Sequence, residues 1–539
     1  MRVSSASVAL ALVCVGAGCA PGPRARQAVA RIVEVRAVRA TVDPSVSDGY
    51  GHHAAFVAGP VEGAVLGRLE GAGLEHAPAL SAALRDIGRF APSRHRIPAA
   101  LVEGVLARHG LPDPPPRLVV VELDGDPGTE CKGAGTVCAD LATSLEGAAR
   151  SHAAGLSKPV VGVGAVPLSG RKGLRIVLGV LDRGVELEPF PRAVPVGASV
   201  QLRGRLAPGR HRPSLEIVDP SGRIHTRSVG VGAGGVFAAD VVCPSRGIMR
   251  IEVLAVGAYG PEVVANAPVG CGRDLPASFT VEVEWLRPGT TPEEVARASA
   301  ALVAEERRRR GLSALTWDED VAAVARSHAA EMATRGYVGH VSPVTGDAAS
   351  RVARAGISAR TVRENVARGY GPREIHGSLL RSPGHRANLL ADDVDRIGIG
   401  VAFGTREGDD PGAPRPIYVV QVFVRRPLDP GRAAPSVLAR MLRERGLVRA
   451  PAAVEDPALS KLAADDAEHV AAGRSLDPAR RTAALAAAGY GGASRIEAVA
   501  PAFEDLVEAS LWNDVAGRYG IGVVRRGDGA YVLVVYVAR

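Results

Sequence analysis

Lysine is nearly missing from this sequence. It supplies four of the 65 lysine and arginine residues, and arginine is spread along the whole chain. The formal net charge of +8 is therefore diluted over 539 residues. Because proteins that bind nucleic acid gather basic residues into a patch or stripe, this distribution argues against a nucleic-acid partner.

Sequence patterns that mark hydrolases and nucleotide-binding proteins are missing as well. There is no GxSxG serine elbow and no glycine-rich phosphate loop. The HExxH pattern of zinc peptidases is incomplete, because the segment that begins at His328 continues Ala-Ala-Glu-Met and lacks the second histidine. These absences weigh against a hydrolase without deciding what the chain does instead.

Apolar runs long enough to span a bilayer are absent after the first 20 residues. Residues 6–18 form a shorter apolar run behind a basic start, which is typical of a secretory signal. The run ends Val-Gly-Ala-Gly-Cys and resembles a bacterial lipobox, in which Cys19 is lipidated and becomes the mature N-terminus. We therefore expect residues 1–19 to be a signal peptide of the lipoprotein type, with a plain cleaved signal as the alternative.

Cysteine is scarce but informative. Without Cys14 and Cys19, four cysteines are left, and they pair most simply as sequence neighbours, Cys131 with Cys138 and Cys243 with Cys271. Neither pair has CxxC spacing or the nearby histidines of a zinc site. Two disulfides and an oxidising compartment are predicted. The expected location is the cell envelope, as an outer membrane lipoprotein or a periplasmic or extracellular protein.

The length and texture of the chain indicate a multi-domain α+β protein. Hydrophobic residues make up 46%, enough to bury cores, and 539 residues correspond to about three to five domains. Residues 189–285 contain short alternating runs separated by Pro and Gly, which predict an Ig-like β-sandwich acting as a spacer. The remaining boundaries are predicted as a linker, a first α+β domain and two further α+β domains, at 20–50, 51–188, 290–428 and 432–539.

A histidine lies on the buried stripe of a predicted helix that begins near residue 319. His328 recurs at core spacing with Val321, Val324, Ala325 and Met332. We expect a satisfied core histidine, with a direct ligand role as the alternative.

Residues 296–424 resemble the CAP superfamily (SCP/PR-1-like, SCP-like extracellular domain) in its bacterial form. The resemblance rests on ordered strings spread over this whole stretch: LVAEER at 302–307, LTWD at 315–318, ARSHAAEMA at 325–333, GHVSP at 339–343, ENV at 364–366, SPGHRANLL at 382–390, GIGV at 398–401 and YVVQVF at 418–423.

This resemblance implies an α-β-α sandwich with a cleft where two histidines and a carboxylate meet. Carried over to this sequence, these residues are His340, Glu364 and His385. Ser382 stands where eukaryotic members usually have a second glutamate.

The chemistry of this trio leaves several readings open. Two imidazoles and a carboxylate are common ligands of a divalent cation such as zinc. They could equally act as an acid/base pair or form a hydrogen-bonded knot that pins loops together. Ser342 and Ser382 lie near the histidines in Pro-bounded turns, where a hydroxyl ordinarily caps backbone amides.

Weaker copies of the same pattern occur elsewhere in the chain. In residues 432–539 a GIGV string recurs at 520–523, and Asp466 falls where His328 stands in the middle copy. The SPGHR turn and both site histidines are absent from this copy. A VGVG string at 161–164 suggests that residues 51–188 are a third, more eroded copy.

Together these features favour an exported, lipid-anchored CAP-domain protein of the envelope. It would bind an unknown small-molecule or lipid ligand without being an enzyme, with a divalent cation as a candidate cofactor and the membrane contacted through the lipid anchor. The alternatives are a metal-dependent, peptidase-like envelope hydrolase and a structural or adhesive surface protein with a vestigial cleft.

Overall fold

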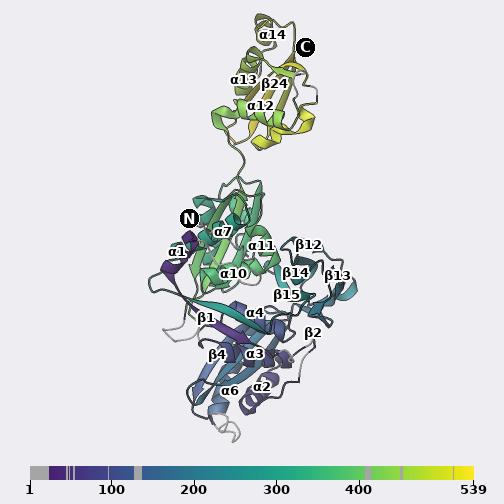
Figure 1. Ribbon diagram of the computed structural model, residues 1–539. Helices are drawn as coiled ribbons and strands as arrows, with labels where there is room; N and C mark the ends of the chain where they lie inside the picture. Colours follow the sequence, from purple (N-terminus) through teal and green to yellow (C-terminus); the bar gives the residue numbers. More distant parts are fainter. Residues whose placement is uncertain are drawn as a thin grey trace, which may run out of the picture. The chain divides into compact units, whose positions relative to one another are not determined.

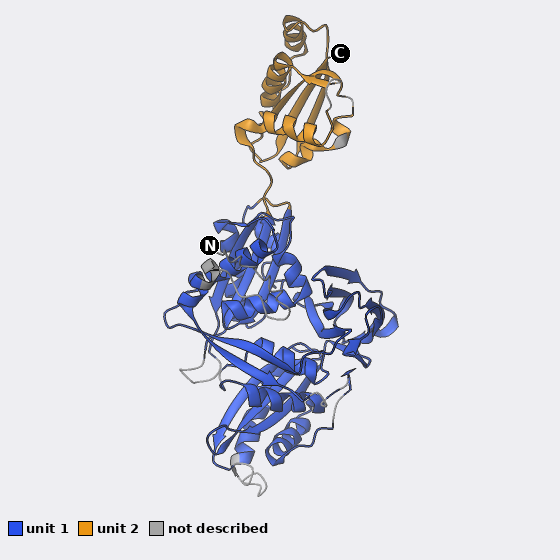
Figure 2. Cartoon of the chain, viewed as in Figure 1, with its two compact units in different colours: residues 1–357, 361–424 blue, residues 358–360, 425–539 orange. Residues whose placement is uncertain are grey.

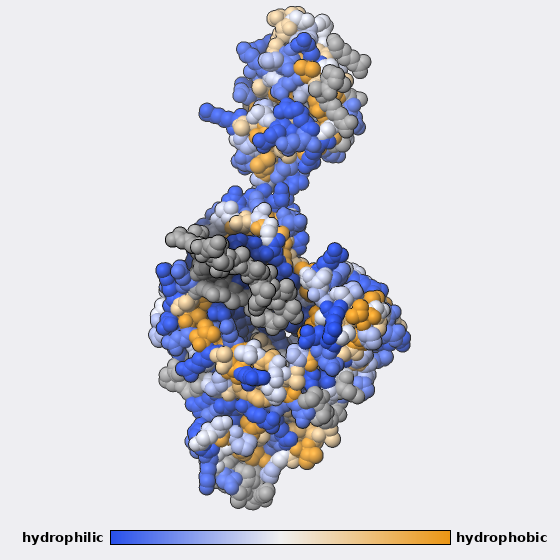
Figure 3. Space-filling model, viewed as in Figure 1, coloured by the Kyte–Doolittle hydropathy of each residue, from blue (hydrophilic) through white to orange (hydrophobic). Residues whose placement is uncertain are grey.

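The computed structural model describes residues 23–538, apart from 44–46, 48, 53–54, 95, 127–135, 407–413, 449–452 and 514 (Figure 1). It divides into two compact units, one of residues 1–357 with 361–424 and one of 358–360 with 425–539 (Figure 2). The predicted signal peptide and Cys19 lie outside the described residues. Within the described ranges, none of the helices has the length and apolarity to cross a membrane. Apolar residues are scattered among hydrophilic ones on the face shown in Figure 3.

Part of the segment predicted to be a linker is regular structure. Helix α1 (Pro23–Ile32) leads into strand β1 (Val33–Thr41), which pairs antiparallel along its whole length with β16 (Ser278–Leu286). Apolar side chains at the two ends of this segment are buried in two different cores. Composition suggested a tether because the segment lacks its own period, whereas its order comes from partners about 240 residues away in the sequence.

The first α+β module of unit 1 has three layers. Its sheet has the order β3-β5-β6-β4. Helix α3 covers one face, while α2 and α6 cover the other. The elements are α2 (Pro60–Gly71), β3 (Glu75–His76), α3 (Pro78–Phe90), α4 (Ala99–Arg108), β4 (Arg117–Asp124), α6 (Thr136–Ala153), β5 (Pro159–Pro167) and β6 (Gly173–Asp182).

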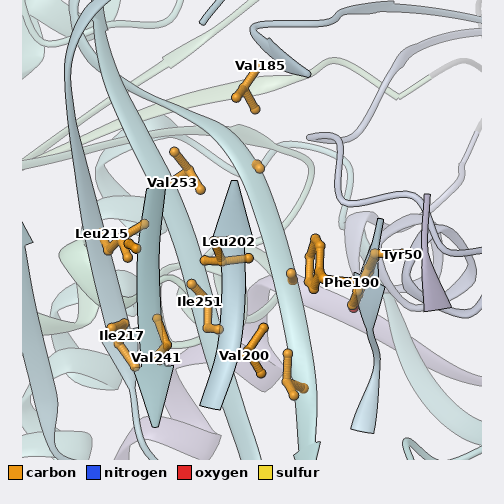
Figure 4. Close-up of a cluster of buried hydrophobic side chains, with 14 of the residues drawn as sticks. Tyr50, Val185, Phe190, Val200, Leu202, Leu215, Ile217, Val241, Ile251 and Val253 are labelled. Atoms are coloured by element: carbon orange, nitrogen blue, oxygen red, sulfur yellow. The ribbon is translucent and has the colours of Figure 1, made fainter. Parts of the chain in front are cut away.

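The next module consists of two β-sheets on a shared apolar core (Figure 4). Alternating burial along its strands places Leu202, Leu215 and Ile251 in that core. One sheet has the order β13-β10-β7 and the other β12-β11-β14-β15-β9. The strands are β7 (Val185–Leu187), β9 (Ala193–Val194), β10 (Ser199–Leu206), β11 (His211–Val218), β12 (Ile224–Ser228), β13 (Val236–Val242), β14 (Gly247–Gly257) and β15 (Gly260–Cys271). Below, this part is called the two-sheet module.

One predicted disulfide is confirmed in this module. Cys243 and Cys271 are bonded, with their Cα atoms 5.5 Å apart. Cys138 is also disulfide-bonded, and Cys131 lies outside the described residues.

The module with the candidate site is again an α-β-α sandwich. Its sheet has the order β17-β19-β20-β18. Helix α8 lies on one face, and α7, α10 and α11 pack into the core on the other. The elements are α7 (Pro292–Arg309), β17 (Thr316–Trp317), α8 (Glu319–Arg335), α9 (Ala348–Arg354), β18 (Thr361–Gly369), α10 (Pro372–Arg381), α11 (Pro383–Leu389), β19 (Arg396–Phe403) and β20 (Ile417–Arg425).

Unit 2 contains a sheet of the order β21-β23-β24-β22, with α13 on one face. On the other face of the sheet, a second hydrophobic core contains helix α12 and two short 3-10 helices, Phe503–Val507 and Ala509–Leu511. The elements are α12 (Ala434–Glu444), β21 (Ala453–Glu455), α13 (Pro457–Ala471), α14 (Pro478–Ala487), β22 (Ser494–Ala500), β23 (Gly517–Arg525) and β24 (Tyr531–Ala538).

The three four-stranded sheets share one topology. In each, the first short strand runs parallel to the third strand, and the third runs antiparallel to the fourth. In each, two glycines of the third strand lie directly under a helix. A Cβ added to Gly400 would come within 2.1 Å of the Ala325 carbonyl carbon of α8, and Gly164 and Gly522 are similarly close to α3 and α13. The backbones therefore touch, and no larger residue fits.

We predict that Gly400→Ala destabilises unit 1 by about 1–3 kcal/mol or more, since the added methyl group overlaps the α8 backbone. Urea unfolding of the full chain measures this. Gly63→Ala on α2 is the control, because its added methyl group meets no atom within 4 Å. Equal midpoints for the two variants would contradict the close-packing account.

Candidate functional site

His340 is held by a buried carboxylate. Its Nδ1 lies 3.0 Å from Oε1 of Glu364 on β18, and the guanidinium of Arg351 on α9 pairs with the other oxygen of Glu364. The Glu364 side chain is 3% exposed, while that of His340 is 26% exposed. Because a carboxylate accepts hydrogen bonds, Nδ1 carries a proton, and in the neutral form of the ring Nε2 keeps its lone pair.

His385 is held differently. It lies on α11, and its Nδ1 is 2.8 Å from the hydroxyl of Ser382, the residue that precedes that helix. Ser382 in turn donates to Oε2 of Glu252 at 2.8 Å, and Glu252 belongs to β14 of the two-sheet module. Burial of the imidazole lowers the pKa of His385 to about 4. His385 is therefore neutral at pH 7.

The two imidazoles are neighbours. The ring centroids of His340 and His385 are 6.2 Å apart, with 30° between their planes. The His340 side chain is partly exposed, and residue His385 is half-buried. The structure thus brings together His340, Glu364, His385 and Ser382.

His328 lies in the core rather than beside the other two rings. It is 1% exposed, and its Nε2 donates to the carbonyl of Gly339 at 2.9 Å. Burial, with the charge of Arg351, lowers its pKa. Among the described residues its Nδ1 has no hydrogen-bond partner. His328 therefore fixes the turn that carries His340.

The two serines near the site behave differently from each other. The Ser342 hydroxyl accepts from the amides of Val344 and Thr345 at 3.0 and 2.8 Å, as expected for a turn cap. The Ser382 hydroxyl makes no such cap bond, and the expectation of a capping role is wrong for it. Its lone hydrogen is used by Glu252 across the module boundary.

Sequence reasoning missed a buried amide network beneath the histidines. Asn365 is fully buried and donates to the His385 carbonyl and to Gln421 Oε1, both at 3.1 Å. Asn388 donates to the Glu364 carbonyl at 2.9 Å. A signal was present for Gln421, which interrupts an otherwise apolar strand.

Sequence reasoning also missed the two-sheet module's part in the site. The Tyr259 carbonyl accepts from the amides of His340 and Val341, both at 3.0 Å. Its ring stacks on Tyr337 with centroids 4.7 Å apart. No local pattern around Tyr259 or Glu252 predicts these contacts, because their partners lie far along the chain.

Two nitrogen atoms of this site are suited to bind a cation. In the described part of the chain, no group of three or more His, Cys, Asp or Glu side chains is placed to hold a metal ion. Both Glu364 oxygens are engaged by His340 and Arg351, so Glu364 stands behind His340 as its orienting partner. The Nε2 atoms of His340 and His385 are the groups that could hold a cation, with further positions open to water or a ligand.

Comparison with known proteins identifies this module. Residues 300–423 match the CAP family model, described as the cysteine-rich secretory protein family. This part of the chain is a CAP domain. The sequence prediction of the family is thereby confirmed.

Two curated relatives, both from Bacillus subtilis (strain 168), are similar over part of their length. The uncharacterized protein YkwD is 35% identical over 96 residues, which are 18% of this chain and 37% of that protein. The uncharacterized membrane protein YlbC is 32% identical over 120 residues, which are 22% of this chain and 34% of that protein. The chain thus spans about a third of the length of these relatives.

Among solved structures, an extracellular protein containing a SCP domain from Bacillus anthracis str. Ames is 16% identical, with a TM-score of 0.22. The match covers 45% of this chain and 86% of that one.

Glu252 provides a pH-dependent test of the contact between the modules. Burial raises its pKa from 4.5 to about 8, and the nearby carboxylates of Glu103 and Glu216 add to this. A carboxyl whose folded pKa is raised binds its proton more tightly in the folded state, so folding loses stability as pH rises from about 4.5 to about 8. We predict that Glu252→Gln, which carries no titrating group, removes this loss.

Urea unfolding of wild type and Glu252→Gln at pH 5.5 and 8.5 checks the prediction. The stability of the variant relative to wild type should be greater at pH 8.5. A relative stability that does not change between the two pH values would show that Glu252 is not desolvated.

Proposed function

We propose that this chain is an exported protein of the cell envelope whose CAP domain binds a ligand through His340 and His385. The supporting observation is the pair of neighbouring imidazoles, whose ring centroids are 6.2 Å apart and of which that of His340 is partly exposed. Each ring is tied at Nδ1 by its own partner, which directs Nε2 to the ligand. Two such lone pairs suit a divalent cation such as zinc, either alone or bridging to a small-molecule or lipid ligand.

The hydrogen bonds of the Ser382 hydroxyl, which lies beside His385, favour ligand binding over hydrolysis. Ser382 donates to Glu252 and lies against His385 Nδ1, so it is a link between two side chains rather than a nucleophile. Glu364 is paired with Arg351 and is not available as a general base. The site is therefore built to hold a ligand in place.

Export is supported by three features. The apolar run at residues 6–18 has the form of a secretory signal, and Cys19 ends a lipobox-like string. The Cys243–Cys271 disulfide is typical of an oxidising compartment. A relative bears the name of a membrane protein. We propose lipidation of Cys19 as the anchor, with the folded modules outside the cytoplasm.

The first module and unit 2 are proposed to be degenerate copies of the CAP fold. The shared strand order and the glycines beneath α3 and α13 support this. Gly522 lies on Ala463 as Gly400 lies on Ala325, and three residues further along the helices are Asp466 and His328. Asp466 is buried and accepts from the hydroxyl of Tyr536. Ligand binding is therefore assigned to the middle copy.

Zinc titration of the purified full chain, followed by calorimetry, tests the proposed function. Wild type should bind one equivalent. His340→Ala and His385→Ala should each weaken binding by at least about tenfold, because each removes one of two donors. The double variant should bind none, which also tests whether the flanking copies bind metal.

His469→Ala is the matched control, since His469 is a histidine of unit 2 that bonds its own helix backbone. It should bind zinc like wild type. A wild-type chain that takes up no zinc, or a double variant that binds one equivalent, would refute the metal-binding site.

A further inference from the structure

Glu252 is a carboxyl group in an unusual place. It lies on a central strand of the two-sheet module between Ile251 and Val253, and it is 2% exposed. Its register neighbours are Glu216 on β11 and Asn266 on β15, which form a polar row across the sheet. A buried carboxyl group needs a hydrogen-bond partner, and within the described part of the chain Ser382 of the CAP domain supplies it.

The polar row faces the start of α11. Besides the bond from Ser382 to Glu252, a Cβ added to Gly384 would lie 3.8 Å from the Glu216 side chain. Gly384 is therefore in contact distance of the sheet, and His385 follows it directly. The sheet supports the turn that carries His385.

The donors and acceptors of this link determine which ring nitrogen of His385 keeps its lone pair. When Glu252 is ionised it can only accept, so the one hydrogen of the Ser382 hydroxyl is given to Glu252 Oε2. The 2.8 Å contact with His385 then needs Nδ1–H as the donor. This leaves Nε2 with its lone pair, the same state that Glu364 imposes on His340.

The tip of the same hairpin holds the other histidine. Tyr259 lies between β14 and β15 and accepts from the amides of His340 and Val341. A Cβ added to Gly339 would lie 2.4 Å from the Tyr259 Cβ, so the loop is pressed against the hairpin. One hairpin therefore contacts both segments that carry the imidazoles.

We propose that the β14–β15 hairpin completes the histidine site, with Glu252 as a positioning residue that sets the tautomer of His385 through Ser382. The proposal rests on the proposed function for its ligand but not for its geometry. The two-sheet module, which the sequence presents as a spacer, becomes part of the binding site.

Nitrogen NMR of the full chain with labelled histidine rings at pH 9, where Glu252 is ionised, tests the tautomer, and the His385 signal is assigned with His385→Gln. Wild type should show a proton on Nδ1 and none on Nε2. Glu252→Ala and Ser382→Ala should lose this preference. Glu252→Gln should restore it, because the amide carbonyl still accepts from Ser382.

Zinc affinity is the second readout. Glu252→Ala and Ser382→Ala should each bind about 10–100-fold more weakly, the usual cost of losing a partner behind a ligand. Glu252→Gln should bind like wild type. Glu186→Gln is the matched control, because Glu186 lies on β7 in the other sheet of the module and pairs with Lys158 instead. Ser382→Ala removes one hydroxyl and keeps the test decisive if Glu252→Ala does not fold.

The outcomes separate this proposal from the previous one. A wild-type His385 protonated at Nε2, or a tautomer unchanged in Ser382→Ala and Glu252→Ala, would overturn the positioning role. Absence of zinc binding with the predicted tautomer pattern would leave the positioning role standing and refute only the metal.

Discussion

The α8 helix lies so close to β19 that their backbones are in contact, and the candidate site depends on this approach. Gly398 and Gly400 allow it because any Cβ would overlap α8. Once α8 is seated, His328 on its buried face is brought to the Gly339 carbonyl. That bond fixes the turn leading to His340, and Glu364 and Arg351 then fix the ring. Close packing of two glycines against the α8 backbone thus positions the histidine and the carboxylate of the site.

A second set of constraints comes from outside the CAP domain. Arg96 of the first module is fully buried, pairs with Glu374 on α10 and donates to the Glu284 carbonyl at 3.1 Å. Separating the two partners of a buried ion pair leaves a charge without its counter-charge, which is costly. The Arg96–Glu374 pair therefore opposes separation of the two modules. Because α10 leads directly into α11, the first module and the two-sheet module both restrain the segment that carries His385.

The features predicted from sequence are those with a local or ordered pattern. The GIGV and SPGHR strings located the CAP domain and its histidines, and helical spacing placed His328 in the core. The bonding of Ser382 could not be predicted, because its partner Glu252 is 130 residues away on another module. Composition likewise misjudged residues 23–41, whose order depends on β16 and α7 rather than on any period of their own. Long-range polar contacts leave no periodic trace in a sequence, so they have to be read from the fold.

The pairing of β1 with β16 has a consequence for how the chain assembles. Val29, Ile32 and Val33 belong to the core of the CAP domain, although its first helix, α7, begins about 260 residues later in the chain. In the sequence, the first module and the two-sheet module are therefore inserted between two segments that contribute to one hydrophobic core. During synthesis, residues 23–41 are made before β16 and α7. Their partners in the folded protein are therefore absent until those elements have been made. Because the entropic cost of closing a loop grows only slowly with its length, an insertion of this size between two segments of one core remains affordable to the fold.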